Sequence, residues 1–372
     1  MRRKSNVVLL DSDSQESRQK AANWARAADA LGLDVNASPD SRTVAILPCS
    51  DHAAVEAAWL CHAHDVPGPD PVAAAVASSK ALAYGFLSSR GFNVLPFFVP
   101  TRERDFQVTL NRPVIVKPEH GSGTVAPVPW AYQVFDSVAD FRRYLISTRQ
   151  EAAFLAYQRR PHPGTGRFLI MEYVDTSRIH IVQCVIGDGH LVAFDQASSI
   201  FKEPQMTVES TVLGGKLRDA DAVVGMAKAL AGLGLRRTIL IMQCLEHRGK
   251  LYPIDFNLRL GAMIDRFIAV AGLDFYARAL EFFVGRGRSF GFSWPAPWVG
   301  LHRIYLPRRK GQFRAEFGPG CVPLMDRVQY DPRKPYDWGY SLPVFAVLCR
   351  TRAEIPRRIK EVVRSTVLRR LH

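Results

Sequence analysis

Two short apolar runs near the start of the chain, Val7–Leu10 and Val44–Leu47, predict buried strands. Each run is followed by an alanine-rich stretch with helical spacing, over Glu16–Leu31 and about His52–His64. Strand, helix, strand and helix in this order predict a small parallel α/β unit. A cluster of prolines and a glycine from Pro67 to Pro71 ends this pattern.

The remainder of the chain predicts a strand-rich centre with flanking helices. One helix is expected over Ala73–Arg90, closed by Gly91. Expected strands are Val94–Val99, Val114–Lys117, Phe168–Val174, Ile179–Ile186, Gly189–Ala193, Thr238–Leu245 and Lys250–Phe256. Hairpin turns are expected at 187–189 and 247–249. Two further helices are expected at about Asp219–Gly232 and Asp274–Val284. Apolar residues spaced among arginines predict one amphipathic helix over Thr351–Leu371, with Pro356 in its first turn.

Composition narrows the class of protein. The chain has 372 residues, 47% of them hydrophobic and 23% charged, which excludes disordered and fibrous classes. No apolar run approaches the roughly 20 residues that cross a bilayer, and Val7–Leu10 is too short for the core of an export signal. Six scattered cysteines without a C-x-x-C pair favour reduced, buried thiols, so we expect a cytoplasmic protein. Because no apolar run is long enough to cross a bilayer, we expect no membrane partner.

The positive charge of the chain is concentrated at its end. The formal net charge is +14, and residues 300–372 contain 16 Lys and Arg against 6 Asp and Glu. A total of this size suggests a polyanion partner, but the predicted C-terminal helix has no interleaved aromatic residues of the kind that bind single-stranded nucleic acid. We therefore expect no nucleic-acid partner; this segment is predicted to close over an anionic substrate or to pack at a subunit interface.

Three polar constellations stand on the predicted strands. Lys117 ends an apolar strand and is followed by Gly121-Ser122-Gly123-Thr124, a pattern that suits phosphate contacts through a lysine and backbone N–H groups, and equally an ordinary hairpin. Asp255, Asn257 and Arg259 alternate, which predicts a shared face. Their oxygens suit Mg²⁺ and the guanidinium suits a phosphoryl group, although a polar wet face would show the same alternation. Glu172 near the end of another strand says little alone.

The order of these motifs resembles the ATP-grasp superfamily, in the branch of biotin carboxylase and the carbamoyl phosphate synthetase large chain. The resemblance covers about Val7 to Gly285. Ser79-Lys80 before Gly91 resembles the family's Asp-Lys/Arg segment, Met171–Val174 its adenine hinge, and Asp255-Phe-Asn257-Leu-Arg259 its Glu-x-Asn-x-Arg motif. It implies an α/β ATP-grasp fold after a small Rossmann-like domain, with domains at 1–79, 80–290 (lid lobe about 110–175) and 291–372, the last a basic segment that completes the substrate side.

The resemblance also implies residue roles. ATP would be bound by Lys80, Lys117, Gly121, Ser122, Gly123, Glu172, Tyr173, Val174 and Lys202; Mg²⁺, with Mn²⁺ as an alternative, by Gln243, Asp255 and Asn257; and catalysis would involve Arg259, Lys117 and Arg303. The sequence departs from the family pattern in three places. Ser79 replaces an aspartate, Asp255 replaces the commoner glutamate, and the acid that usually binds ribose beyond the hinge is absent.

The implied activity is an ATP-dependent carboxylate–amine ligase that makes an amide or peptide bond through an acyl phosphate and releases ADP and phosphate. Its partners would be a small carboxylate and an amine, with a homodimer as the family-level expectation. Two alternatives remain at this level. One is a carboxylase-type enzyme that works through carboxyphosphate. The other is a non-catalytic ATP-binding sensor, which the missing ribose acid favours.

Overall fold

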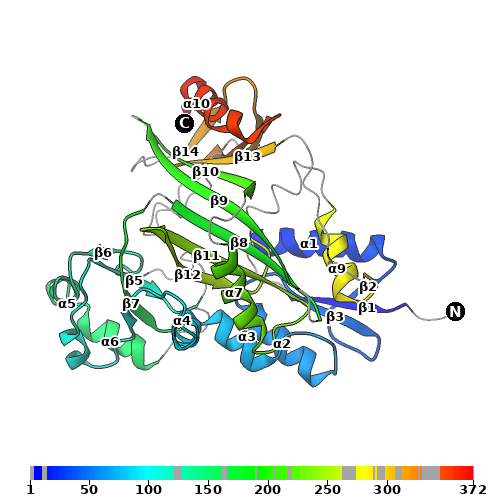
Figure 1. Cartoon of the computed structure of the whole chain (residues 1–372), viewed down its shortest axis with the longest axis horizontal. Coiled ribbons are helices and arrows are strands. Elements are labelled where there is room, and N and C mark those ends of the chain that lie inside the picture. The colour runs from blue at the N-terminus through cyan, green and yellow to red at the C-terminus, as the bar shows by residue number, and fades with distance from the viewer. Residues whose placement is uncertain are drawn as a thin grey trace.

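In the computed structural model, the described residues form mixed α/β layers around four sheets (Figure 1). The structure describes residues 4–10, 15–120, 128–160, 166–176, 178–188, 191–203, 206–215, 220–261, 274–287, 290, 298–305, 312–325, 327–328 and 344–371. Three parts of the chain occupy separate ends of the view, and a large sheet runs between them. They are the amino-terminal unit, the sheet beside α5 (Val138–Ser147) and α6 (Glu151–Arg159), and the carboxyl-terminal elements.

The amino-terminal unit is a parallel three-stranded sheet, as predicted. Its elements are β1 (Asn6–Leu10), α1 (Gln15–Ala30), β2 (Asp34–Asn36), β3 (Thr43–Pro48) and α2 (Ala53–Ala63), with strand order β2-β1-β3. Val7 and Val8 are fully buried, because a strand covered on both faces must be apolar at successive positions. Trp24 of α1 packs edge-on against Tyr276, with ring centroids 4.6 Å apart, which attaches this unit to the rest of the chain.

The single helix predicted over Ala73–Arg90 is wrong. The chain forms two helices, α3 (Pro71–Ser78) and α4 (Lys80–Ser89). Ser79 between them is extended, with φ −99° and ψ 115°, and its hydroxyl accepts a hydrogen bond from the Leu82 N–H at 3.2 Å. Serine competes for backbone donors in this way and therefore starts a new helix. The break places Lys80 at the first turn of α4.

A four-stranded antiparallel sheet of order β4-β7-β5-β6 forms the next lobe. Its elements are β4 (Phe97–Phe98), a 3₁₀ turn (Glu103–Gln107), β5 (Val114–Pro118), β6 (Val134–Phe135), α5 (Val138–Ser147), α6 (Glu151–Arg159) and β7 (Phe168–Glu172). Both α5 and α6 were absent from the sequence predictions. They lie beside this sheet in Figure 1, and their buried aromatic residues Phe141 and Phe154 pack with Phe168 of β7.

The central layer is an eight-stranded sheet of order β12-β11-β8-β9-β10-β13-β17-β15. Its strands are β8 (Arg178–Ile186), β9 (Leu191–Glu203), β10 (Met206–Gly215), β11 (Thr238–His247), β12 (Lys250–Asn257), β13 (Trp298–Tyr305), β15 (Val322–Met325) and β17 (Val344–Cys349), and helices α7 (Ala220–Ala231) and α9 (Phe275–Phe283) accompany it. Strands β9 and β10 pair with each other in antiparallel fashion, from Met206 opposite Glu203 to Gly215 opposite Asp195. Of the short strand expected at Gly189–Ala193, residues 191–193 form the start of the much longer β9, and 189–190 lie outside the described residues.

The predicted helix over Thr351–Leu371 is also wrong in its second half. A 3₁₀ turn (Arg352–Glu354) leads into α10 (Ile355–Ser365), with Pro356 in its first turn as expected, and β18 (Val367–Leu371) follows. Strand β18 pairs antiparallel with β14 (Gln312–Glu316), which also pairs with β16 (Arg327–Val328). The apolar positions of 367–371 suit a strand as well as a helix, and the free edge of β14 decides between them. The domain boundaries given above stay a prediction.

Candidate active site

The hairpin of β11 and β12 places the predicted metal residues together. In the strand register Gln243 lies opposite Asp255, and Ile241 lies opposite Asn257. Alternation along β12 puts the side chains of Asp255 and Asn257 on one face, while Phe256 between them enters the hydrophobic core on the other. Asp255 and Asn257 are only 7% and 5% exposed. These polar groups therefore do not form an ordinary solvated strand face.

Lys80 reaches Asp255 from the start of α4. Its Nζ lies 2.8 Å from Asp255 Oδ1, and the lysine is only 1% exposed. The backbone around it is fixed twice, because Lys80 N–H donates to the Glu119 carbonyl at 2.9 Å and the Ser79 hydroxyl donates to Glu119 Oε1 at 2.6 Å. Ser79 therefore has a structural role here: it caps α4 and ties the lysine to the end of β5.

Lys117 approaches the same place from the four-stranded sheet. Its Nζ donates a 2.6 Å hydrogen bond to the carbonyl of Ile254, the residue before Asp255. Tyr84 Oη donates to the same carbonyl, also at 2.6 Å. Burial lowers the pKa of Lys117 from its ordinary 10.5 to about 8; Asp255 opposes this shift and Lys80 adds to it. Two lysines and one carboxylate thus meet where the two sheets face each other.

Arg259 and Asn257 are held by a residue of the amino-terminal unit, Asp51. Arg259 binds both carboxylate oxygens of Asp51, with Nε 2.7 Å from Oδ1 and Nη2 2.9 Å from Oδ2. The Asn257 amide is matched when its nitrogen faces Asp51, donating to Oδ1 at 2.8 Å. In this orientation its oxygen occupies the position 3.5 Å from Asp255 Oδ2. Two oxygens so close, one of them charged, suit a bridging cation.

A cavity of about 170 Å³ adjoins these residues. It is lined by Asp51, His52, Val55, Ser78, His120, Phe256, Asn257 and Leu258. The Ser78 hydroxyl is buried there without a hydrogen-bond partner, and His120 Nδ1 lies 3.0 Å from the Ser78 carbonyl. The sequence reasoning missed Asp51, His52, Ser78 and His120. A signal for Asp51 existed: it follows the second predicted strand, and polar residues after parallel strands gather at one sheet edge.

The predicted adenine hinge lies between the two sheets. The Tyr173 N–H donates to the Pro113 carbonyl at 2.6 Å, and Glu172 Oε1 accepts from the Asn111 N–H at 3.0 Å. Burial, and then the nearby Asp175, raise the pKa of Tyr173. Val174 is buried. The Glu172 carboxylate therefore anchors the loop before β5, and the backbone of 172–174 is fixed in place.

Five predicted site residues are placed less fully. Gly121, Ser122 and Gly123 lie outside the described residues. The backbone of Lys202 lies in β9 opposite Thr207, and that of Arg303 lies in β13 between Glu209 and Val344. The side chains of Lys202 and Arg303 are outside what the structure describes, so their predicted roles stay predictions.

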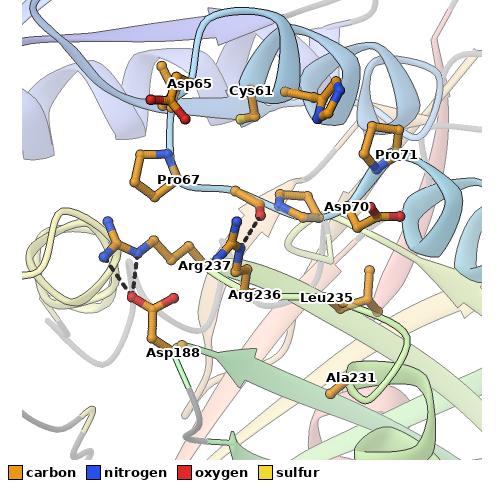
Figure 2. Close-up of a pocket in the computed structure, with 16 residues that line it drawn as sticks. Cys61, Asp65, Pro67, Asp70, Pro71, Asp188, Ala231, Leu235, Arg236 and Arg237 are labelled. Carbon is orange, nitrogen blue, oxygen red and sulfur yellow. Dashed lines mark hydrogen bonds and ion pairs between the residues drawn. The ribbon is translucent and has the colours of Figure 1, made fainter.

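A second cavity, of about 600 Å³, lies along the segment that joins α2 to α3. Arg237 pairs with Asp188 (Figure 2), with Nη2 2.6 Å from Oδ2. Arg236 Nε donates to the Gly68 carbonyl at 3.0 Å. The residues lining this cavity include none of those described above around Asp255 and Asp51. Its arginines are engaged with protein groups, so the candidate site is the smaller cavity beside Asn257.

No protein-family model and no curated protein matches the sequence. Solved structures do match it. The L-amino acid ligase from Bacillus licheniformis aligns over 100% of both chains, with a TM-score of 0.70 and 13% identity. The chain has the ATP-grasp fold. This confirms the resemblance and the fold class predicted from the motifs.

Two further ATP-grasp structures support this assignment. The biotin carboxylase domain of 2-oxoglutarate carboxylase from Hydrogenobacter thermophilus, solved with MgADP and bicarbonate, covers 100% of this chain and 92% of its own, with a TM-score of 0.66 and 16% identity. N5-carboxyaminoimidazole synthetase from Staphylococcus aureus covers 96% and 97%, with a TM-score of 0.64 and 11% identity. At these identities the likeness establishes the fold.

Two further features of the described residues concern membranes and metals. Among them, no helix is long and apolar enough to cross a membrane. They contain no cluster of three or more His, Cys, Asp or Glu that could hold a metal alone. Mg²⁺ needs fewer protein ligands than that, because it keeps waters and takes oxygens from substrate phosphates. Asp255 and Asn257, with Gln243 opposite, therefore fit a metal that binds together with a nucleotide.

Proposed function

We propose that the protein is an ATP-dependent carboxylate–amine ligase, which forms an amide or peptide bond through an acyl phosphate. The observation that carries the proposal is the meeting of Lys80, Lys117 and Asp255 beside Asn257. The fold supports it, since the matching structures include an L-amino acid ligase and a phosphoribosylglycinamide synthetase. Buried lysines that face a carboxylate suit a site where polyanions are bound and brought together.

ATP would bind between the two sheets, with its adenine against the Glu172–Val174 backbone. Lys80 and Lys117 would hold the phosphates, aided by Lys202 and the backbone of Gly121–Gly123. The Lys80–Asp255 ion pair suggests an exchange: when phosphate oxygens reach Lys80 Nζ, Asp255 is released. It then becomes available, with Asn257 and Gln243, to hold Mg²⁺ or Mn²⁺, which would neutralise charge on the transferring phosphoryl group.

The proposed chemistry has two steps. A carboxylate oxygen of the acid attacks the γ-phosphorus of ATP, the bond to ADP breaks, and an acyl phosphate forms. The amine nitrogen then attacks the acyl carbon, phosphate departs with that carboxylate oxygen, and the nitrogen loses a proton. Arg259 would stabilise the phosphoryl group and the tetrahedral oxyanion, and Arg303 is a further candidate for anion contact. Water must be excluded, because acyl phosphates hydrolyse readily.

The cavity beside Asn257 is our candidate for substrate binding. Its volume is about 170 Å³ and most of the residues that line it are polar, so it suits a small polar compound. Ser78, His52 and His120 line this cavity, and the Ser78 hydroxyl is buried without a hydrogen-bond partner. We expect a small acid or amine, and no nucleic acid or membrane, as the partner. A cytoplasmic location and a homodimer belong to the same proposal.

A carboxylase-type reaction through carboxyphosphate is the second candidate. It is favoured by the match to a biotin carboxylase domain solved with bicarbonate, which covers the whole of this chain. The two candidates differ in the acid that is phosphorylated. Bicarbonate-dependent ADP formation without an organic acid would support the carboxylase.

The proposal is tested by measuring phosphate release over a matrix of amino acids and small carboxylic acids, with bicarbonate as a separate arm. We expect ADP formation that needs both an acid and an amine. Lys117→Ala should abolish it. Asp65→Asn should not, because Asp65 lines the second cavity and not the smaller one, and its φ of 54° is one that asparagine tolerates. ATP turnover that is unchanged in Lys117→Ala would show that the site is misassigned.

A further inference from the structure

Asp51 contacts two of the three residues of the Asp255-x-Asn257-x-Arg259 motif, although it belongs to a different unit of the chain. It lies after β3, on the loop that leads to α2, and is separated from Arg259 by 208 residues. Arg259 binds both of its oxygens, and Asn257 donates to Oδ1 in the amide orientation that satisfies both ends of the side chain. The two side chains of the ion pair are 10% and 14% exposed, so solvent screens this pair little.

These contacts fix two orientations that the proposed reaction needs. A bidentate pair sets the plane of the Arg259 guanidinium, because Nε and Nη2 must both face the carboxylate. Nη1 donates to the Leu260 carbonyl at 3.0 Å, which limits rotation further. The hydrogen bond from Asn257 sets which end of its amide faces Asp255. Without an acceptor at Asp51, the nitrogen keeps only the Phe256 carbonyl at 3.1 Å, so the amide is held less firmly and can turn to present its nitrogen, which cannot bind a cation.

We propose that Asp51 is a positioning residue for catalysis: through its carboxylate, the amino-terminal unit orients Arg259 toward the transferring group and the Asn257 oxygen toward the metal. The inference rests on the ligase proposed above. Asp51 would not touch the reacting atoms. It would act as the outer partners of metal ligands do, which fix orientation and typically change metal affinity by roughly 10- to 100-fold when they are removed.

A purely structural ion pair that joins two units of the chain would show the same contacts. The two roles differ in what a substitution changes. A structural pair affects the unfolding temperature and leaves the kinetics of the folded enzyme intact. A positioning residue lowers kcat in the folded enzyme, leaves the KM for ATP nearly unchanged because Lys80 and Lys117 lie elsewhere, and weakens the metal site.

The first test compares Asp51→Asn with Asp51→Glu and with the control Asp65→Asn. Asp51→Asn keeps the shape but turns one acceptor into a donor that opposes Arg259. We expect kcat to fall roughly 10- to 100-fold with the KM for ATP within about threefold. Asp51→Glu keeps both acceptor oxygens and should recover part of the loss, and Asp65→Asn should match the wild type. A wild-type kcat for folded Asp51→Asn would overturn the proposal.

The second test asks whether Asp51 acts through Arg259. Arg259→Lys keeps the positive charge but cannot form the bidentate interaction with the Asp51 carboxylate. If Asp51 orients Arg259, the double variant Asp51→Asn/Arg259→Lys should lose less kcat than the product of the two single losses. Losses that multiply would mean that the residues act independently, which would contradict the proposal.

The third test needs no turnover, so it separates a failure of this inference from a failure of the proposed function. Mn²⁺ binding in the presence of ADP is measured by electron paramagnetic resonance for the full chain. We expect about 10-fold weaker Mn²⁺ binding in Asp51→Asn than in the wild type, and an unchanged affinity in Asp65→Asn. If the wild type shows no turnover that depends on an acid and an amine, the proposed ligase function fails. Weaker Mn²⁺ binding in Asp51→Asn would still support the positioning role of Asp51. An unchanged Mn²⁺ affinity in Asp51→Asn would overturn it.

Discussion

The segment 254–259 interacts with positively charged side chains at both of its ends, but in different ways. At one end Lys80 pairs with Asp255 and Lys117 donates to the Ile254 carbonyl, so each lysine contacts this segment directly. At the other end Arg259 is part of the motif, and its partner Asp51 comes from the amino-terminal unit. The lysine end is therefore assembled from α4, β5 and β12, whereas the arginine end requires the loop after β3 in the amino-terminal unit. A single short motif thus depends on two separate parts of the fold.

The largest expected effect comes from breaking the lysine end. Lys80→Met and Lys117→Met should each lower ATP turnover by roughly 10²- to 10³-fold, because each removes a preorganised positive charge. Their effects on stability should differ. Lys80→Met leaves Asp255 buried and unpaired, a loss of about 3–5 kcal/mol in the free energy of unfolding. Lys117→Met leaves only a carbonyl that Tyr84 still satisfies, so we expect about 1 kcal/mol or less.

Urea unfolding of the two variants measures that difference, with Asp65→Asn as the matched control. Equal losses of stability in Lys80→Met and Lys117→Met would contradict the distinction between an ion pair at Asp255 and a hydrogen bond at Ile254. A stable Lys80→Met protein would show that Asp255 finds another partner.

The metal affinity of the motif gives the next largest effect. Asp255→Asn removes the carboxylate of the proposed metal pair, and we expect roughly 10- to 100-fold weaker Mg²⁺ activation of turnover, with the same order of loss in Mn²⁺ binding with ADP. Asp255→Glu, which restores the commoner residue of the family pattern, should retain metal binding. Equal Mg²⁺ activation in the wild type and in Asp255→Asn would remove Asp255 from the metal site.

The pH dependence sharpens the comparison, because lysine titrates here and arginine does not. Burial holds the pKa of Lys117 at about 8, against an ordinary 10.5 in the unfolded chain. Below pH 8 the lysine is charged in both states, so the cost of burying its charge is fully present. Between about pH 8 and 10.5 the folded lysine loses its proton first, and this cost is relieved. The free energy of unfolding of the wild type relative to Lys117→Met should therefore rise over this interval, by about 1–3 kcal/mol.

Enzymatic activity should fall with rising pH as Lys117 loses its proton, whereas the free energy of unfolding rises. Phosphate binding needs the charged lysine, so kcat/KM for ATP, which reports the free enzyme, should fall above about pH 8. The slope should approach tenfold per pH unit. A profile that stays flat to pH 10 would mean that Lys117 is not the titrating phosphate contact, and a matching profile for Lys117→Arg would point to another group.

The smallest effect is expected at the second cavity. Asp188→Asn breaks the Arg237 pair, but Asp188 is half exposed, so the stability loss should be at most about 1 kcal/mol. Turnover should stay within twofold of the wild type. A large loss of turnover would show that the cavity in Figure 2 contributes to the site. The site would then extend beyond the two ends of the segment 254–259.

The sequence predicted the parts of the site and of the fold that depend on local motifs and on local hydrophobic patterns. Lys80, Lys117, Asp255 and Asn257 follow one another in a recognisable order, and they do meet in the structure. The parallel sheet of β1, β2 and β3 followed from apolar runs and helical spacing. The break at Ser79 did not, because alanine-rich flanks hide a single capping serine whose partner, Glu119, lies 40 residues away.

Contacts between distant parts of the chain were beyond the sequence. Asp51 is one of several acids after predicted strands, and only the fold brings it to Arg259. Val367–Leu371 became a strand because β14 offers a free edge, and no local pattern reports such an edge. Tertiary pairing overrode propensity at this place, as is common for short apolar segments.

The central claim is that ATP cleavage passes through an acyl phosphate of an organic acid. It is tested most directly by supplying the active acid with ¹⁸O in both carboxylate oxygens and analysing the released phosphate by mass spectrometry. The account predicts one ¹⁸O atom in each phosphate formed, ADP as the nucleotide product, and no release without acid. Unlabelled phosphate, or label found in AMP, would contradict it.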